Sequence, residues 1–243
     1  MLQSVPVRSI VVAQRFCGPP SSANGGYIAG LIASLATGTV TVRLLKPPPL
    51  GIEMQVVDTP DGGLEVRQGG EAVAVASPGS LALRPPTPPS YFEALAASAR
   101  YAGFGTNPFP TCFVCGPLRP RGDGLRIFAG VLPREERTVA APWVPDASLD
   151  QGDGKVRAEF MWAALDCPGF YAASADSRLM LLAEFTAHVD RRVHVGQPCC
   201  VVGWSISSSG RKHEVGTALF DHDGEECARA RALWIEPKRE AGK

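Results

Sequence analysis

The chain has 243 residues, of which 45% are hydrophobic, and it carries 24 basic and 24 acidic side chains. This length suits one large domain or two of ordinary size with a substantial core. A zero net charge gives no electrostatic footprint for nucleic acid or for an anionic membrane. Apolar runs such as 28–36 are far shorter than the roughly 20 residues of a membrane span, and residues 1–14 lack secretory-signal features. The seven cysteines, with Cys199 and Cys200 adjacent, do not resemble a secreted disulfide framework, so we expect a cytoplasmic location.

The first half predicts one helix followed by a run of strands. Residues 5–14 have the β-branched content of a strand, and the Gly-Pro-Pro sequence at 18–20 ends it. Tyr27, Leu31 and Leu35 then repeat at helical spacing after candidate N-caps at 21–24. Glycine-containing turns separate the strands that we expect next, which are 39–45, 52–59, 63–68 and 71–77.

The second half repeats this order after a connector. Residues 84–89 are rich in proline and form a stiff boundary, which a short helix at 91–101 follows. A long apolar helix begins near Phe160. The strands expected around it are 125–131, 138–144, 179–189, 200–207, 213–221 and 227–235.

A sequence motif supports an internal duplication. Residues 70–76 and 224–230 share the pattern Gly-Glu-x-small/apolar-Ala-x-Ala, each directly after a turn and near the end of a half. The agreement of motif, order and position predicts an α+β fold in which two antiparallel sheets each wrap around a long central helix. The expected units are residues 1–83, a connector at 84–110, and residues 111–237.

Asp166 is the main candidate for chemistry, because it is a single acid in the apolar run 160–175. On a continuous helix, Trp162 and Phe170 lie one turn before and after it on the same face. An apolar surround raises the pKa of a carboxyl group, as a general base or acid requires. Two structural alternatives remain: Asp166 is an N-cap with Pro168 in the first turn, or a buried acid held by backbone donors.

The order of several landmarks resembles the hotdog-fold thioesterases, and in particular the double-hotdog members related to acyl-CoA thioesterase II. The residues that carry the resemblance are 22–30 with 42–50 after them, 112–117 leading to 124–127, 162–169, and 223–234. The resemblance implies a helix inside a curved antiparallel sheet, two copies per chain, and hydrolysis of an acyl-CoA thioester at the seam between the copies. It also implies no metal or redox cofactor.

The resemblance assigns residue roles as well. Asp166 matches the position of an acid that acts on the thioester carbonyl directly or through water, and the backbone amides at Asn24, Gly25 and Gly26 match the helix start that polarises the carbonyl oxygen. Two departures stand out. The first copy has Ile28 where a second acid would lie, and Pro168 interrupts the helix just after Asp166.

Other polar residues give weaker indications. Alternation on the strand 179–189 places Thr186 and His188 on one face, where either side chain could orient a water for Asp166. Cys112 and Cys115 form half of a zinc motif, but no second pair accompanies them, so packing is the expected role and no metal site is predicted.

Three functions on this fold remain open. The first is hydrolysis of acyl-CoA or a related thioester, with surface arginines such as Arg191, Arg192 or Arg211 near the coenzyme phosphates. The second is acyl-CoA or fatty-acyl binding without catalysis. The third, a hydratase or dehydratase, is ranked last because no histidine lies near the helix start. Two copies per chain are compatible with a monomer, and an exposed sheet edge is compatible with a homo-oligomer.

Overall fold

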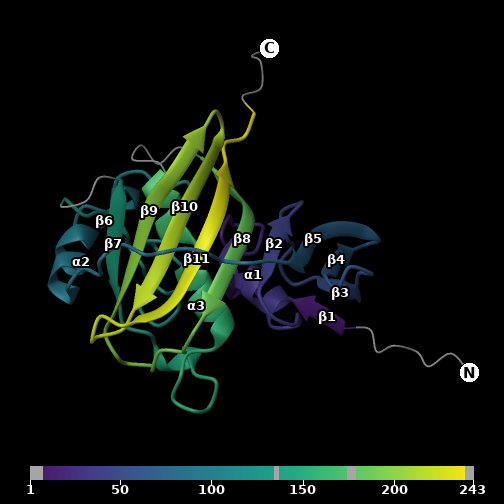
Figure 1. Cartoon of the computed structure of the whole chain (residues 1–243), viewed down its shortest axis with the longest axis horizontal. Coiled ribbons are helices and arrows are strands. Elements are labelled where there is room, and N and C mark those ends of the chain that lie inside the picture. Colours follow the sequence, from purple (N-terminus) through teal and green to yellow (C-terminus); the bar gives the residue numbers. More distant parts are fainter. Residues whose placement is uncertain (1–7, 134–136, 174–178, 239–243) are drawn as a thin grey trace, which may run out of the picture.

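The computed structural model describes residues 8–133, 137–173 and 179–238, so the start of the strand expected at 5–14 lies outside it (Figure 1). The first strands are β1 (Arg8–Val11), β2 (Val40–Leu44), β3 (Glu53–Asp58), β4 (Leu64–Gln68) and β5 (Glu71–Pro78). Those of the second half are β6 (Gly130–Val131), β7 (Thr138–Trp143), β8 (Leu181–Val189), β9 (Cys199–Ser209), β10 (Lys212–Phe220) and β11 (Glu226–Ile235). The α-helices are α1 (Gly25–Ala33), α2 (Tyr91–Ser98), α3 (Ala158–Ala164) and α4 (Cys167–Ala173).

The strands of both halves form one sheet, and the expectation of two separate sheets is wrong. In the described residues the sheet has 11 strands, in the order β1-β3-β4-β5-β2-β8-β11-β10-β9-β7-β6. The halves join where β2 pairs with β8, with Val42 opposite Phe185. At this seam the hydroxyl groups of Thr41 and Thr186 share a hydrogen bond of 2.7 Å. Pairing the two edges satisfies backbone groups that separate sheets would leave open.

The strand order repeats on the two sides of the seam. Moving outward from it, the order is β2, β5, β4, β3, β1 on one side and β8, β11, β10, β9, β7 on the other, where the short β6 follows as an additional edge strand. The two copies of the sequence motif begin β5 and β11, which hold equivalent places. Helix α1 lies between β1 and β2 in the chain, and α3 with α4 lies between β7 and β8. This order agrees with a duplicated architecture, while the unit boundaries at 83 and 110 stay predictions.

Helices α1 and α3 cross at very short range. A methyl group on Gly26 would lie 2.6 Å from Asp166 Cβ and 2.7 Å from the Trp162 carbonyl oxygen. A methyl group on Gly30 would lie 2.7 Å from Glu159 Cα. Because residues four apart share one helix face, the two glycines together open the side of α1 that meets α3.

The helix expected from Phe160 onward is broken into α3 and α4. Leu165 and Asp166 form the break, and Pro168 lies in the first turn of α4. A proline there needs no N–H partner, whereas in a continuous helix its ring would collide with the carbonyl of Ala164. The predicted interruption by Pro168 is therefore confirmed, and it leaves the Asp166 side chain free to turn toward α1.

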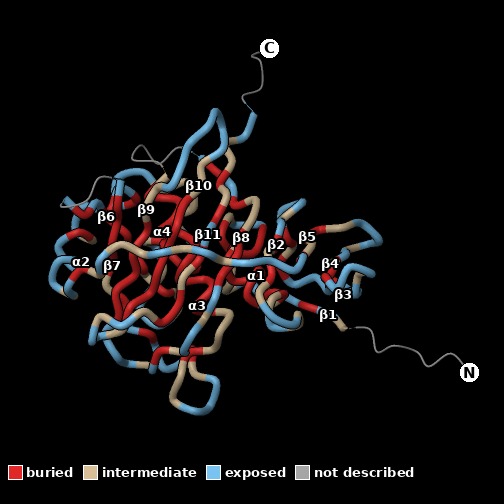
Figure 2. Tube along the Cα trace, in the orientation of Figure 1, coloured by how far each residue is buried: buried red, intermediate tan, exposed pale blue. Residues whose placement is uncertain are grey.

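Helix α2 lies within the predicted connector and packs against the end of the sheet formed by β6, β7 and β9. Ser90 caps it: the Ser90 hydroxyl accepts a hydrogen bond from the Glu93 N–H, and the Glu93 carboxylate accepts one from the Ser90 N–H. Ala94 and Ala97 of α2 pack in a cluster with Ala140 and Val202, whereas the neighbouring strand residues belong to the main core. Nearly all of β7 and the first part of β9, residues 199–203, are thus buried on both faces, whereas the far end of β9 is exposed (Figure 2).

The strand expected at 125–131 is reduced to Gly130–Val131. The N–H groups of Leu125 and Ile127 donate instead to the carbonyls of Phe113 and Val114, over 2.8 and 2.9 Å. No helix among the described residues is both long enough and apolar enough to cross a membrane.

Candidate active site

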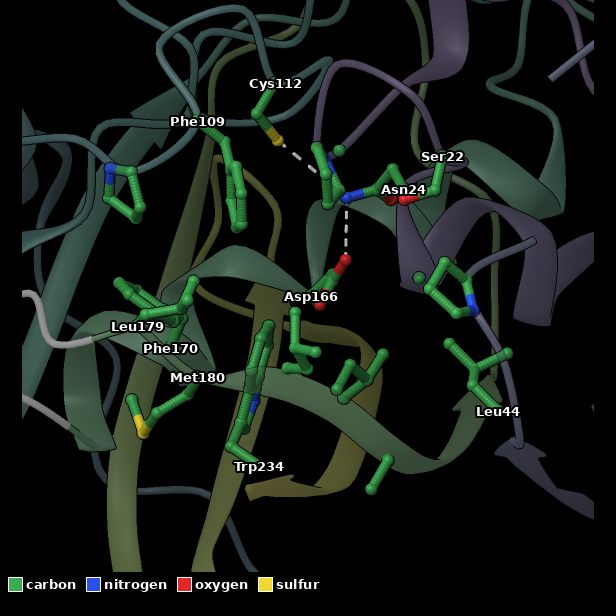
Figure 3. Close-up of a pocket in the computed structure, with 18 of the residues that line it drawn as sticks. Ser22, Asn24, Leu44, Phe109, Cys112, Asp166, Phe170, Leu179, Met180 and Trp234 are labelled. Carbon is green, nitrogen blue, oxygen red and sulfur yellow. Dashed lines mark hydrogen bonds between the residues drawn. The ribbon is translucent and has the colours of Figure 1, made fainter. Parts of the chain in front are cut away.

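Asp166 lies in the break between α3 and α4, where two donors from the first half reach it (Figure 3). Asn24 Nδ2 donates to Asp166 Oδ2 over 2.7 Å, and the Gly26 N–H donates to the same oxygen over 2.9 Å. Asp166 is only 2% exposed, and its Oδ1 has no hydrogen-bond partner within the described residues. Because a buried oxygen without a partner is costly, Oδ1 is the atom that a bound molecule can satisfy.

The amide of Asn24 is oriented by its second role as the N-cap of α1. Its Oδ1 accepts a hydrogen bond from the Tyr27 N–H over 2.9 Å, which turns Nδ2 toward Asp166. The Asn24 N–H donates to the Phe16 carbonyl over 2.8 Å and fixes the approach to the helix. One side chain thus caps α1 and positions the carboxylate of the other half.

A cavity of about 490 Å³ lies beside Asp166, a volume typical of small-molecule sites. Asn24, Gly25 and Asp166 belong to its wall. Most of the other lining side chains are apolar, among them Leu44, Phe109, Phe170, Leu179, Met180 and Trp234 (Figure 3). The arrangement presents one fixed carboxyl group to an apolar space.

Burial is the main influence on the Asp166 carboxyl group. It raises the pKa of Asp166 to about 7, against the opposing effect of the Gly26 and Asn24 hydrogen bonds. Cys112, whose charge would repel the carboxylate, raises this pKa further. A group of this pKa exchanges a proton readily near neutral pH.

Comparison with solved structures identifies the architecture. The acyl-CoA thioesterase II TesB2 of Mycobacterium marinum matches with a TM-score of 0.62 and 12% identity, over 100% of this chain and 97% of that chain. The tesB protein of Mycobacterium avium subs paratuberculosis matches with a TM-score of 0.57 and 16% identity, over 88% of this chain and 87% of that chain. A conserved protein with a hot dog fold from Alicyclobacillus acidocaldarius matches with a TM-score of 0.54 and 13% identity, over 97% and 96%. The chain has the fold of the hotdog thioesterases. No sequence family model and no curated protein matches it.

The residues predicted for the site of this hotdog chain are only partly brought together. Asp166, Asn24 and Gly26 meet through hydrogen bonds, and Gly25 lines the same cavity. Asp166 precedes α4 as an N-cap would, but both bonds to its carboxylate come from α1, so capping is not its role. Of the two expected aromatic neighbours, Phe170 lines the cavity, while Trp162 packs edge-on against Phe185 with ring centroids 5.6 Å apart.

Thr186 and His188 of the hotdog sheet are not among the residues that line the cavity, and their water-orienting role stays a prediction. Thr186 shares its hydroxyl hydrogen bond with Thr41 at the seam. The exposed His188 faces Asp190, with Nε2 and Oδ1 3.2 Å apart. Alternation along a strand tells which side chains share a face, but it does not tell which neighbouring element covers that face.

Replacing either residue is therefore expected to have little effect on the chemistry of Asp166. Thr186→Val should keep kcat/KM within about twofold while it lowers the free energy of unfolding by about 1 kcal/mol, because it removes one hydrogen bond at the seam. His188→Ala should change neither quantity appreciably, since a surface ion pair contributes little. Steady-state kinetics and urea unfolding measure both effects, and a large loss of kcat in either variant would support the water-orienting role.

Sequence analysis missed Cys167, which the fold places beside Cys112 and Cys115. The three sulfur atoms all lie within 4.8 Å of one another, and all three residues line the cavity. The sequence holds no second Cys-x-x-Cys motif, and packing is therefore the role that it predicts for Cys112 and Cys115. The signal in the sequence that points to the third thiol is the position of Cys167, directly after the candidate acid Asp166.

Proposed function

We propose that this protein hydrolyses acyl-CoA thioesters, with Asp166 as the general base. The observation that carries the proposal is a buried carboxylate with one oxygen fixed by two donors and the other without a partner, in the wall of an apolar cavity. The similarity of the fold to a full-length thioesterase II structure supports the proposal. Because one fold can host many activities, the main argument comes from the site itself.

In the proposed reaction, the acyl chain occupies the apolar cavity and the thioester carbonyl lies next to Asp166. A water molecule bonded to Oδ1 attacks the carbonyl carbon while its proton passes to the carboxylate. The C–S bond then breaks, and the leaving thiolate receives the proton, which gives a carboxylic acid and free coenzyme A. The hydrogen bonds from Asn24 and Gly26 hold Oδ2 and prevent rotation of the carboxyl group, which keeps Oδ1 aligned with the attacking water.

The start of α1 offers one N–H group for the developing negative charge on the carbonyl oxygen. The Gly26 N–H donates to Asp166 and the Tyr27 N–H donates to Asn24. The Gly25 N–H donates to no protein group within the described residues, and Gly25 lines the cavity. Of the three amides first considered, Gly25 is therefore the one we assign to the oxyanion, with the positive end of the helix dipole behind it.

Lys46 and Arg211 are exposed cations of the cavity lining, and we assign them to the coenzyme phosphates. Arg211→Ala is expected to raise KM for an acyl-CoA about threefold to fivefold with kcat unchanged, the size of an exposed charge pair. The same variant should leave KM unchanged for the matching acyl-N-acetylcysteamine thioester, which has no phosphate. Arg192 is the control, because it pairs with Asp153 and is not among the lining residues. Equal effects on both substrates would contradict the assignment.

Two assays on one panel of acyl-CoA thioesters distinguish hydrolysis from the alternative, which is acyl binding without hydrolysis. Thiol release, followed with a chromogenic disulfide, reports hydrolysis, and the shift in melting temperature reports binding. We expect both for the preferred chain lengths. Stabilisation without thiol release would favour the binding protein. A hydratase is not supported, because no histidine is among the lining residues of the described chain.

A further inference from the structure

Two segments distant in sequence bring three buried thiols together, with Cys112 and Cys167 55 residues apart. Cys112 and Cys115 lie on the turn that precedes Gly116, and Cys167 is the first residue of α4. The sulfur atoms of Cys112 and Cys167 are 3.7 Å apart, and all three sulfurs lie within 4.8 Å of one another. All the cysteines of the chain are free thiols. The other four cysteines belong to no group of three or more metal-ligating side chains among the described residues.

The separation of the sulfurs fits coordination by a metal ion. A thiolate lies about 2.3 Å from zinc, so two thiolates of a tetrahedral site lie roughly 3.8 Å apart. The observed 3.7 Å is close to this value, whereas a disulfide needs about 2.05 Å. Three thiolates also form a donor set that selects soft or borderline cations over magnesium and calcium.

Close packing and hydrogen bonds hold the three thiols in place. A methyl group on Gly116 would lie 2.6 Å from the backbone N and O of Cys112, so the turn needs glycine there. The Tyr101 hydroxyl donates to the Cys115 carbonyl over 2.8 Å and lies 2.7 Å from the hydroxyl of Tyr171 on α4. Tyr101 thus ties the turn to the helix that carries Cys167, which prepares the ligands before an ion arrives.

We propose that Cys112, Cys115 and Cys167 bind a zinc ion through three thiolates, with an exogenous ligand such as water in the fourth position. All three residues line the cavity, which supplies both an entry path for the ion and room for the fourth ligand. Because Cys167 directly follows Asp166, the ion would fasten the start of α4 to the turn beside the carboxylate. The proposal does not depend on the hydrolase activity, and no step of hydrolysis passes through the ion.

The first test uses the full chain without a polyhistidine tag, reduced, freed of metal with a chelator and titrated with Co²⁺ and then Zn²⁺. We expect one equivalent of Co²⁺ to give an intense thiolate-to-cobalt absorption that Zn²⁺ removes. Bound zinc should protect the three cluster thiols from a thiol reagent until a chelator is added. No absorption at millimolar Co²⁺, or equal reactivity of all thiols with and without zinc, would overturn the site.

Variants assign the ligands independently. Cys112→Ser and Cys167→Ser should each weaken zinc binding by more than about 100-fold, the upper end of losses caused by outer-shell changes. Cys227→Ser is the matched control, because Cys227 is equally buried and lies outside the cluster, and it should bind as the parent does. Circular dichroism checks that each variant is folded. Unchanged binding in both cluster variants, or a cluster that forms a disulfide in air and binds no metal after reduction, would contradict the proposal.

Discussion

Asp166→Asn is expected to lower kcat for acyl-CoA hydrolysis by about 100-fold to 10,000-fold, the usual contribution of a general base. The asparagine keeps the shape of the side chain, and its Oδ1 can still accept from Asn24 and Gly26 at the place of the present Oδ2. It cannot take a proton from water near neutral pH. Single-turnover rates with excess enzyme measure the loss, and binding of a non-hydrolysable acyl-CoA thioether should remain within about threefold.

Glu159→Gln is the matched control for this loss. Glu159 lies on α3, the helix that precedes Asp166, and its Oε1 is 3.2 Å from Arg157 Nε. It is not among the residues that line the cavity. Removing its charge should leave kcat/KM within about twofold. Turnover by Asp166→Asn at the parental rate over the whole acyl-CoA panel would eliminate Asp166 as the base.

Gly26→Ala is expected to be strongly destabilising. The added methyl would overlap Asp166 Cβ and the Trp162 carbonyl oxygen, and neither can move without shifting α3. Overpacking of this kind costs roughly 1–3 kcal/mol and occasionally more, and rigid backbone neighbours place Gly26 at the upper end, about 3 kcal/mol or above. Hydrolysis per folded molecule should fall as well, because the Gly26 N–H and the carboxylate are forced apart. Urea unfolding and specific activity measure the two losses.

Gly30→Ala and Gly105→Ala separate crowding at the helix crossing from the substitution itself. Gly30→Ala should lower stability by a similar amount, since its methyl would meet Glu159 Cα at 2.7 Å, but with less effect on activity because it does not touch Asp166. A methyl group on Gly105 would lie 3.7 Å from the Ala102 carbonyl oxygen, an ordinary van der Waals distance. The φ of Gly105 is −89°, a value that alanine also adopts. Stability should there stay equal or rise by up to about 1 kcal/mol. Equal stability in all three variants would contradict the tight crossing.

Local patterns located most elements, because alternation and turn residues act over short distances. The strands expected at 63–68 and 71–77 correspond to β4 (Leu64–Gln68) and β5 (Glu71–Pro78). The continuity of the sheet could not be predicted in this way. It depends on the pairing of β2 with β8, where Thr41 and Thr186 are 145 residues apart and carry no shared local signal.

The site shows the same division between local and long-range information. Asp166 could be selected because an acid in an apolar run is unusual, and the helix start at Asn24 could be selected from capping residues. The two meet only because α1 and α3 cross, which local patterns do not predict. As a result the Gly26 N–H, which the sequence predicts to face a substrate, donates to Asp166. Cys167 joins Cys112 and Cys115 through the same tertiary packing.

A crystal structure of the full chain with a non-hydrolysable acyl-CoA thioether tests the placement of the chemistry most directly. We expect the acyl chain in the cavity between Leu44 and Phe170, the atoms that replace the thioester within one water molecule of Asp166, and the phosphates near Lys46 and Arg211. An analogue bound on another face, with the Asp166 carboxyl group closed off from it by protein, would contradict the account.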